Sequence, residues 1–313
     1  MTKRLIGMAV SALILWLIWR RIDAHALALA IRSSNPGWLI AGLACVVPLT
    51  LATAWRFHIL ARSNVTLREA LRLILSASTL NLFFPSKMGD LAKGWVLARR
   101  HAVDGHPAVA IVVLEKLLDL ASLLLWGVTA LVWVAGDDPW LWLMAALVAA
   151  LLILLMLLIG PWPLAAWAMR RLSARLPGRI GRTARSFPHE WTTLIRWFWS
   201  DRRRALWVVA LSVLLWAGHL AQFWLFAHAL DADVPFIDNM AFATLAILVG
   251  LLPFTMAGIG TRDAAIMFFY KPWLLPTQGA LLGVLATTRY LIPALAGLPF
   301  LKDYLPGRRA IAQ

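Results

Sequence analysis

Long uncharged stretches alternate with short polar segments along the whole chain. Several of these stretches reach about 18 residues, the length that an apolar helix needs to cross a bilayer. No stretch shows the alternation over roughly ten residues that marks a membrane-spanning strand. The pattern therefore predicts an all-α polytopic membrane protein, with full spans near residues 5–20, 37–59, 107–135, 139–168, 205–230 and 277–300.

Two further apolar segments, 71–98 and 239–270, are interrupted by Pro85 and Pro253. Proline with nearby glycine ends or kinks a helix. Each segment is therefore either one kinked span or a re-entrant hairpin that enters and leaves on one side. Basic residues are typical of cytoplasmic flanks, and both flanks of the first segment are basic, which favours a hairpin. These flanking residues are Arg62, Arg68, Arg72, Arg99 and Arg100.

The charged loops predict a membrane topology with both termini in the cytoplasm. The segment 170–204 is the most arginine-rich part of the chain, and we expect it on the cytoplasmic side as a basic loop. The second broken segment follows three aspartates, which places its hairpin on the outer side. The apolar run that begins at Leu5 could be a signal peptide, but Arg20 and Arg21 directly after it favour an uncleaved first span. Residues 21–32 are predicted to form an interfacial helix.

The two breaks resemble each other. Each has a proline after an apolar run, a glycine four or five residues later, and a cation four residues beyond that glycine. In the deduced topology, 37–135 and 205–300 cross the membrane in opposite directions. This is the pattern of an inverted repeat, in which broken helices meet near the membrane midplane.

The chain then divides into five parts. They are an N-terminal span and interfacial segment 1–36, a first repeat 37–135 with its hairpin 71–98, a fourth span and basic loop 136–204, a second repeat 205–300 with its hairpin 239–270, and a tail 301–313.

Composition agrees with a membrane protein, since 61% of the residues are hydrophobic and 14% are charged. The formal net charge is +15. We assign this excess to basic cytoplasmic loops and anionic lipid headgroups. No motif that interleaves aromatic and basic residues accompanies it, so nucleic acid is not an expected partner.

The breaks are candidates for an anion site. A helix that begins after a proline has free N–H groups and a partial positive charge at its N-terminus, which suits a phosphate. Lys87, Lys93 and Arg262 add whole charges, and Gly89, Gly258 and Gly260 permit close backbone approach. The alternative is that the glycines serve helix packing and that the cations pair with Asp90 and Asp263.

Further charges lie inside the predicted spans. Glu115 and Asp119 are four residues apart and share one helix face, with Lys116 adjacent. Arg289 lies midway along 277–300, where a charge usually faces a cavity or a partner. We interpret Arg289 as a headgroup ligand and the two acids as its positioning partners. Both acids, together with Asp90 and Asp263, are also candidate proton carriers. A purely structural pairing of Arg289 with Glu115 or Asp119 is the alternative.

Signals for catalysis are missing from the sequence. His219 and Gln222 could face a cavity, but a hydrogen-bonded packing position is the favoured interpretation. We find no zinc-binding His-Glu-x-x-His motif, no Gly-x-Ser-x-Gly elbow and no Walker-type phosphate loop. We therefore expect no catalytic residue, no metal and no cofactor.

At these residues the chain resembles the transmembrane, flippase-like domain of the lysylphosphatidylglycerol synthases and its stand-alone relatives. The matching stretches are NLFFPSKMGDLAKGWVLARR, AVAIVVLEKLLDLASLLLW and LLPFTMAGIGTRDAAIMFF. Lys116 departs from the arginine of many relatives and weakens bidentate phosphate contact. The positions that fit the family pattern are Pro85, Gly89, Asp90, Lys93, Asp119, Pro253, Gly258, Gly260, Arg262 and Asp263.

The resemblance implies a transporter that moves a lipid between leaflets by alternating access, rather than an enzyme. Its expected substrate is an anionic, phosphate-bearing lipid, bound by Lys87, Lys93, Arg262 and Arg289. The alternatives are an accessory subunit of a lipid-biosynthetic complex and a membrane-embedded lipid-modifying transferase. A lipid-biosynthetic enzyme and a second copy of the chain are the candidate protein partners. The family and the composition indicate a bacterial inner membrane.

Overall fold

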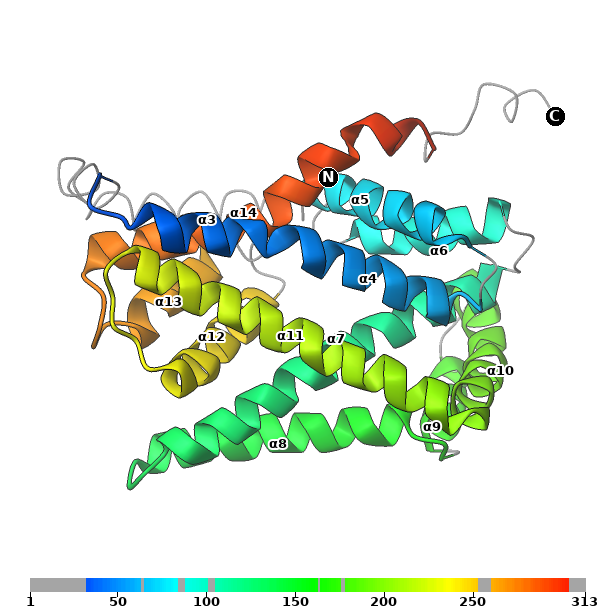
Figure 1. Ribbon diagram of the computed structural model, residues 1–313. Coiled ribbons are helices and arrows are strands. Elements are labelled where there is room, and N and C mark those ends of the chain that lie inside the picture. Colours follow the sequence, from blue (N-terminus) through cyan, green and yellow to red (C-terminus); the bar gives the residue numbers. More distant parts are fainter. Residues whose placement is uncertain are drawn as a thin grey trace.

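The structure, a computed structural model, describes residues 32–62, 65–83, 88–100, 105–162, 164–175, 178–252 and 260–303. All regular elements in these ranges are helices (Figure 1). The helices are α3 (Pro36–Ala44), α4 (Val46–Leu60), α5 (Leu67–Phe83), α6 (Met88–Arg100), α7 (Gly105–Val134), α8 (Pro139–Ile159), α9 (Leu164–Ala174), α10 (Gly178–Ser200), α11 (Arg202–Ala229), α12 (Phe236–Gly250), α13 (Thr261–Phe269) and α14 (Pro276–Gly297), followed by the 3₁₀ helix η3 (Leu298–Asp303).

The predicted fold class, an all-α membrane protein, is confirmed. Four helical stretches of the described chain are long and apolar enough to cross a bilayer, namely Pro36–Leu60, Pro139–Ile159, Arg202–Ala229 and Pro276–Leu301. They coincide with four of the predicted spans. The prediction for 107–135 corresponds to α7, whose 30 residues extend about 45 Å at 1.5 Å per residue. The predicted span 5–20 and the interfacial helix 21–32 lie almost entirely outside the described residues.

The ends of the long helices follow from local sequence. Asn35, Asp138 and Asp201 each accept a hydrogen bond from a backbone N–H of the first turn, at 2.9, 2.8 and 3.1 Å respectively. Such caps satisfy donors that a helix start leaves unpaired. The span predicted as 139–168 ends earlier, at Ile159, because Gly160 is extended before Pro161. The residue before a proline is disfavoured in helical geometry.

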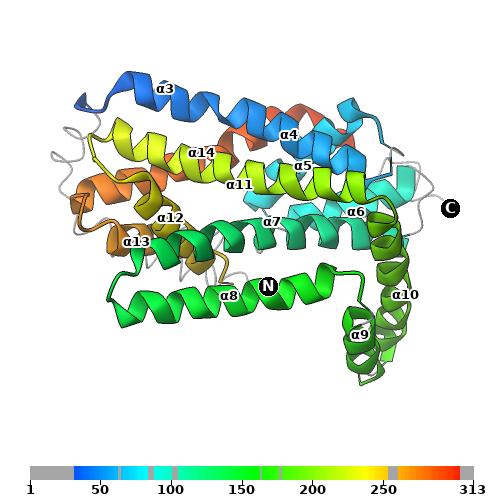
Figure 2. The ribbon, with the colours of Figure 1, turned by 60° about the horizontal axis from the view of Figure 1, so that its bottom comes forward.

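The basic segment 170–204, expected as a loop, is mostly helical. α9 and α10 pack together, and α10 runs across the ends of the long helices α7, α8 and α11 (Figure 2). The reason lies in the second half of α10, where apolar side chains recur at helical spacing on one face. These are Trp191, Leu194, Ile195 and Phe198, all at most 4% exposed.

Each broken segment folds as two helices packed side by side, α5 with α6 and α12 with α13 (Figure 1). A single kinked span would instead place its two halves end to end. The side from which each pair enters the membrane stays a prediction. The turns at 84–87 and 253–259, with Pro85, Lys87, Pro253 and Gly258, lie outside the described residues.

The two halves of the chain pack reciprocally. α14 packs along α5 of the first half, and α7 packs along α12 of the second half. α11 lies at the centre and contacts α3, α4, α7, α12 and α14. The reciprocal contacts agree with the predicted inverted repeat, which itself stays a prediction.

Candidate functional site: a charged cavity between six helices

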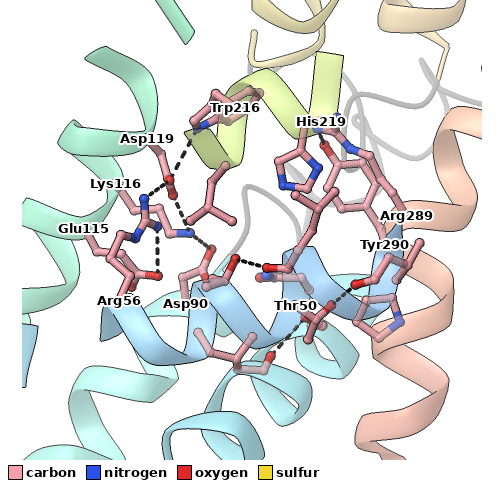
Figure 3. A pocket seen from close by; sticks show the side chains of 18 of the residues that line it. Thr50, Arg56, Asp90, Glu115, Lys116, Asp119, Trp216, His219, Arg289 and Tyr290 are labelled. Atoms are coloured by element: carbon pink, nitrogen blue, oxygen red, sulfur yellow. Dashed lines mark hydrogen bonds and ion pairs between the residues drawn. The ribbon is translucent and has the colours of Figure 1, made fainter. Parts of the chain in front are cut away.

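A cavity opens between α4, α5, α6, α7, α11 and α14 (Figure 3). Its volume is about 180 Å³, which is room for several water molecules. Fifteen of its twenty lining residues carry polar or charged side chains. The polar lining residues are Thr50, Thr53, Arg56, Ser78, Asn81, Asp90, Lys93, Glu115, Lys116, Asp119, Trp216, His219, Gln222, Arg289 and Tyr290.

The acids of α7 organise one wall. Glu115 and Asp119 lie one turn apart, as predicted, and both reach toward Arg56 of α4. Arg56 Nη1 lies 2.7 Å from Asp119 Oδ1, and Arg56 Nη2 lies 3.7 Å from Glu115 Oε1. Arg56 also donates to Ser212 of α11 at 3.0 Å. One guanidinium thus joins three helices at the cavity wall.

The lysines extend this network to α6. Lys93 Nζ lies 2.7 Å from Glu115 Oε2 and 3.3 Å from Asp90 Oδ1. Lys116 Nζ lies 3.3 Å from Asp90 Oδ2 and 3.5 Å from Asp119 Oδ2. Three carboxylates and three cations therefore form one continuous set of ion pairs across α4, α6 and α7, which we name the acid–base network.

Burial makes the pairing in this network necessary. Glu115 is fully buried, and Arg56 and Lys93 are each 1% exposed. A buried charge without a partner is strongly destabilising, because it has lost its hydration and gained nothing in exchange. Lys116 differs from the others, since 42% of its side chain is exposed. It is the member of the network that a ligand can reach most easily.

Arg289 of α14 lies apart from the acid–base network (Figure 3). It is 8% exposed, and its Nη2 donates to the hydroxyl of Tyr290. Its guanidinium carbon lies 4.6 Å from the ring centroid of Tyr290, 5.6 Å from that of Phe223 and 5.8 Å from that of Trp216. Its Nε and Nη1 atoms have no hydrogen-bond partner among the described residues.

The charges that line the cavity do not cancel. The described lining residues include four cations and three carboxylates, which leaves one positive charge. The acid–base network is balanced within itself, so the excess charge is that of Arg289. Unpaired donors on a buried cation are costly, and an anion beside Arg289 would satisfy them.

His219 and Gln222 lie on the α11 wall of the cavity. The sequence favoured a hydrogen-bonded packing position for both. Gln222 does pack, since it donates to Gly42 O at 2.7 Å, and it also lines the cavity. His219 lines the cavity, and its Nδ1 has no hydrogen-bond partner in the described chain. Trp216 donates to Asp119 at 3.3 Å and links this wall to the acid–base network.

The second break lies apart from the cavity lining. Arg262 is 3% exposed and donates to Asp263 Oδ1 at 2.8 Å, to Gly283 O at 2.9 Å and to Thr287 Oγ1 at 2.8 Å. Asp263 also accepts from Gly260 N at 3.0 Å, where Gly260 has a φ of 97°. Neither Arg262 nor Asp263 is among the cavity-lining residues. These contacts fasten α13 to α14, while Arg262 Nη1 has no hydrogen-bond partner among the described residues. The role of Arg262 as a headgroup ligand stays a prediction.

At the first break, Gly89 serves close packing. A methyl group at this position would lie 2.4 Å from Ala77 O and 2.7 Å from Asn81 Oδ1. Any side chain would therefore push α6 away from α5. Asp90, the next residue, and Lys93, one turn further on, then reach the cavity and the charged residues of α7.

Sequence reasoning missed Arg56. It is an arginine near the end of the otherwise apolar run 37–59, and a charge inside a predicted span is itself a signal of a cavity or a partner. It also missed Tyr290, which follows Arg289 directly. The charges of α7 and α14 were identified from the sequence because apolar stretches precede and follow them.

The fold and the cavity define a polytopic helical membrane protein with a charged internal site. The chain belongs to the family of the lysylphosphatidylglycerol synthase transmembrane region, whose model matches residues 4–297. A UPF0104 membrane protein of Methanothermobacter thermautotrophicus is 21% identical over 263 residues, which is 77% of each chain. These similarities support a role connected with membrane lipids.

Proposed function

We propose that this protein binds the phosphate-bearing headgroup of an anionic lipid in its cavity and carries the lipid between the two leaflets. The observation that carries the proposal is Arg289, whose Nε and Nη1 have no acceptor among the described residues. A phosphodiester offers oxygen acceptors and one negative charge, which would balance the single excess charge of the lining. Guanidinium groups suit this geometry because they donate in a planar fork.

The cavity walls also fit transport better than tight storage of a lipid. Lys116 is the exposed cation of the acid–base network, and it can contact a headgroup without giving up both of its carboxylate partners. Apolar residues such as Val46, Leu49 and Ile74 line the same cavity and can contact glycerol or acyl carbons. We infer that the lipid leaves with its headgroup unchanged, so that the protein acts as a transporter and not as an enzyme.

The membrane orientation belongs to the same proposal. The arginines of α9, α10 and the start of α11 mark a cytoplasmic side by the bias of basic residues, and both termini would lie there in the inner membrane of a bacterium. No nucleotide-binding motif occurs in the sequence, so a lipid or ion gradient would drive the movement.

Reconstitution into proteoliposomes tests the proposal. Fluorescent phosphatidylglycerol is placed in both leaflets, and a membrane-impermeant reductant bleaches the outer pool. We expect more than half of the label to become accessible with the protein present. Arg289→Gln should slow this exchange at least about tenfold, because a hydrogen bond to a charged group contributes about 1.5–3 kcal/mol. Lys271→Gln, which removes an exposed cation elsewhere, should have no effect.

Each other result rejects the proposal. Conversion of the headgroup without movement would identify a lipid-modifying enzyme. Neither movement nor conversion, with a lipid-biosynthetic enzyme that co-purifies, would identify an accessory subunit. Equal rates for Arg289→Gln and Lys271→Gln would remove Arg289 from the site.

A further inference from the structure

A second depression lies between α4 and α11, and it shares no lining residue with the cavity. The volume of this depression is about 340 Å³. Its lining is apolar and aromatic apart from one arginine, and consists of Trp55, Ile59, Arg204, Trp207 and Leu211. Trp55 is 46% and Trp207 55% exposed, so this groove opens on the outside of the helix bundle.

The two walls of the groove have matching sequence patterns. On α4, Trp55 and Ile59 lie one turn apart, and Arg62 follows three residues later, just beyond the helix end. On α11, Arg204 precedes Trp207 by three residues. Residues three and four apart share a helix face. Each wall therefore presents an apolar stripe; Arg204 begins the stripe on α11, whereas Arg62 lies beyond the end of α4 with a φ of 57°.

Arg204 lines one end of the groove, and Arg62 lies beside this end because α4 and α11 run antiparallel. Gln222, near the end of α11, donates to Gly42, near the start of the span Pro36–Leu60. Ser212, in the first half of α11, accepts from Arg56, near the end of that span. The ring of Trp197 from α10 lies against both arginines.

The positive charges at this end are close together, with Glu190 near Arg62 and Asp201 near Arg204 as their described acidic neighbours. The guanidinium carbons of Arg62 and Arg204 lie 4.6 and 4.0 Å from the centroid of the same Trp197 ring. Burial and the neighbouring charge of Arg204 lower the pKa of Arg62 from its ordinary value. Asp201 lies 3.8 Å from Arg204, too far for a good hydrogen bond, and is 51% exposed. Arg204 Nη2 donates to Trp197 O and to Ser200 Oγ, whereas Arg204 Nε has no hydrogen-bond partner among the described residues.

We propose that this groove is a binding site for an anionic phospholipid of the surrounding leaflet, separate from the transport cavity. The phosphate lies between Arg62 and Arg204, and the first part of one acyl chain lies against Trp55 and Trp207. The span from Arg204 to Leu211 is about 10 Å along the helix, which gives the chain an apolar floor below the headgroup. A bound phosphate supplies an acceptor for Arg204 Nε and adds negative charge beside the two arginines.

Lipid binding to matched double variants tests this site. Arg62→Gln/Arg204→Gln removes both charges of the groove. Arg202→Gln/Arg203→Gln removes the same charge from exposed positions at the start of the same helix. The intact protein and both variants are purified in detergent and titrated with phosphatidylglycerol, phosphatidylcholine and inorganic phosphate, and bound molecules are counted by native mass spectrometry. Lipid held in the cavity contributes equally to both variants.

We expect the groove variant to bind phosphatidylglycerol at least about tenfold more weakly than the intact protein, because each arginine near a membrane surface contributes a factor of about five. The control should change less than twofold, and phosphatidylcholine should bind all three proteins weakly. Equal phosphatidylglycerol binding by the two variants would overturn the site. Binding of inorganic phosphate as tight as that of the lipid would show a phosphate site without a lipid.

A single variant covers the case in which loss of both arginines prevents folding. Trp207→Glu changes a half-exposed residue and leaves Arg62 and Arg204 in place. Its carboxylate would neutralise the arginines and remove one apolar wall, so phosphatidylglycerol binding should fall to the phosphatidylcholine level. Unchanged binding in this variant would also overturn the proposal.

Discussion

Replacing Glu115 by glutamine tests whether the acid–base network holds the bundle together. Glu115 is fully buried and neutralises two cations that are each 1% exposed. Its carboxylate lies 2.7 Å from Lys93 and 3.7 Å from Arg56. Glutamine has nearly the same shape but no charge, so the substitution removes the electrostatic attraction and leaves the volume unchanged.

The expected loss of stability in the Glu115→Gln variant depends on the carboxylate partners that each cation retains. Removing one partner of a buried ion pair costs about 3–5 kcal/mol when the other charge is left alone. Here Lys93 retains Asp90 at 3.3 Å, and Arg56 retains Asp119 at 2.7 Å. We therefore expect the lower end of this range, about 3 kcal/mol, for the free energy of unfolding.

Reversible unfolding in mixed micelles, with increasing fractions of denaturing detergent, measures this free energy. Asp137→Asn, which changes an exposed carboxylate in the turn between α7 and α8, is the matched control and should change stability by less than about 0.5 kcal/mol. The double variant Glu115→Gln/Lys93→Met should recover part of the loss, because it removes a cation together with its anion. A Glu115→Gln protein as stable as the control would refute the view that these pairs stabilise the bundle.

One contact between the halves of the chain and one within its second half give further predictions. Gly297→Ala should destabilise the protein by about 1–3 kcal/mol, because its methyl group would lie 2.1 Å from Leu75 O and separate α14 from α5; an unchanged thermal midpoint of unfolding would contradict this close approach. Asn239→Leu should cost about 1–3 kcal/mol, because Asn239 donates to Leu220 O at 2.9 Å and accepts from the buried hydroxyl of Tyr270 at 2.8 Å. Adding Tyr270→Phe should recover part of this loss, and full additivity of the two substitutions would contradict the pairing.

Hydrophobic pattern alone was sufficient to predict the long helices. The apolar runs at 37–59, 205–230 and 277–300 match observed helices to within a few residues, because a run of this length has few other stable forms in lipid. The basic segment 170–204 was harder. Its arginines indicate the side of the membrane, but the apolar face of α10 carries the structural information, and it is dispersed among charged residues.

The candidate site could be predicted only in part, because the role of each charged residue depends on the residues that pair with it in the fold. Glu115, Asp119 and Arg289 stand out because a charge within an apolar span needs a cavity or a counter-ion. Which of these applies depends on residues far away in sequence. Arg262 follows the same kind of break as Lys93, yet its Nη2 donates to Asp263, Gly283 and Thr287, and its Nη1 lacks a hydrogen-bond partner among the described residues. No local pattern distinguishes a cation that pairs with its neighbours from one that faces a cavity.

The four cations of the cavity therefore divide into two roles. Lys93 and Arg56 are almost fully buried and bind carboxylates at 2.7 Å, and their donors hold α6 and α4 against α7. α6 is short and carries Asp90, Lys93 and two terminal arginines, so it is too polar to lie in lipid alone. Its place in the bundle depends on the acids of α7. Lys116, through its exposure, and Arg289, through its unpaired donors, are the cations left for a ligand. The residues that allow a polar helix to lie beside the cavity are thus different from those that would bind an anion within it.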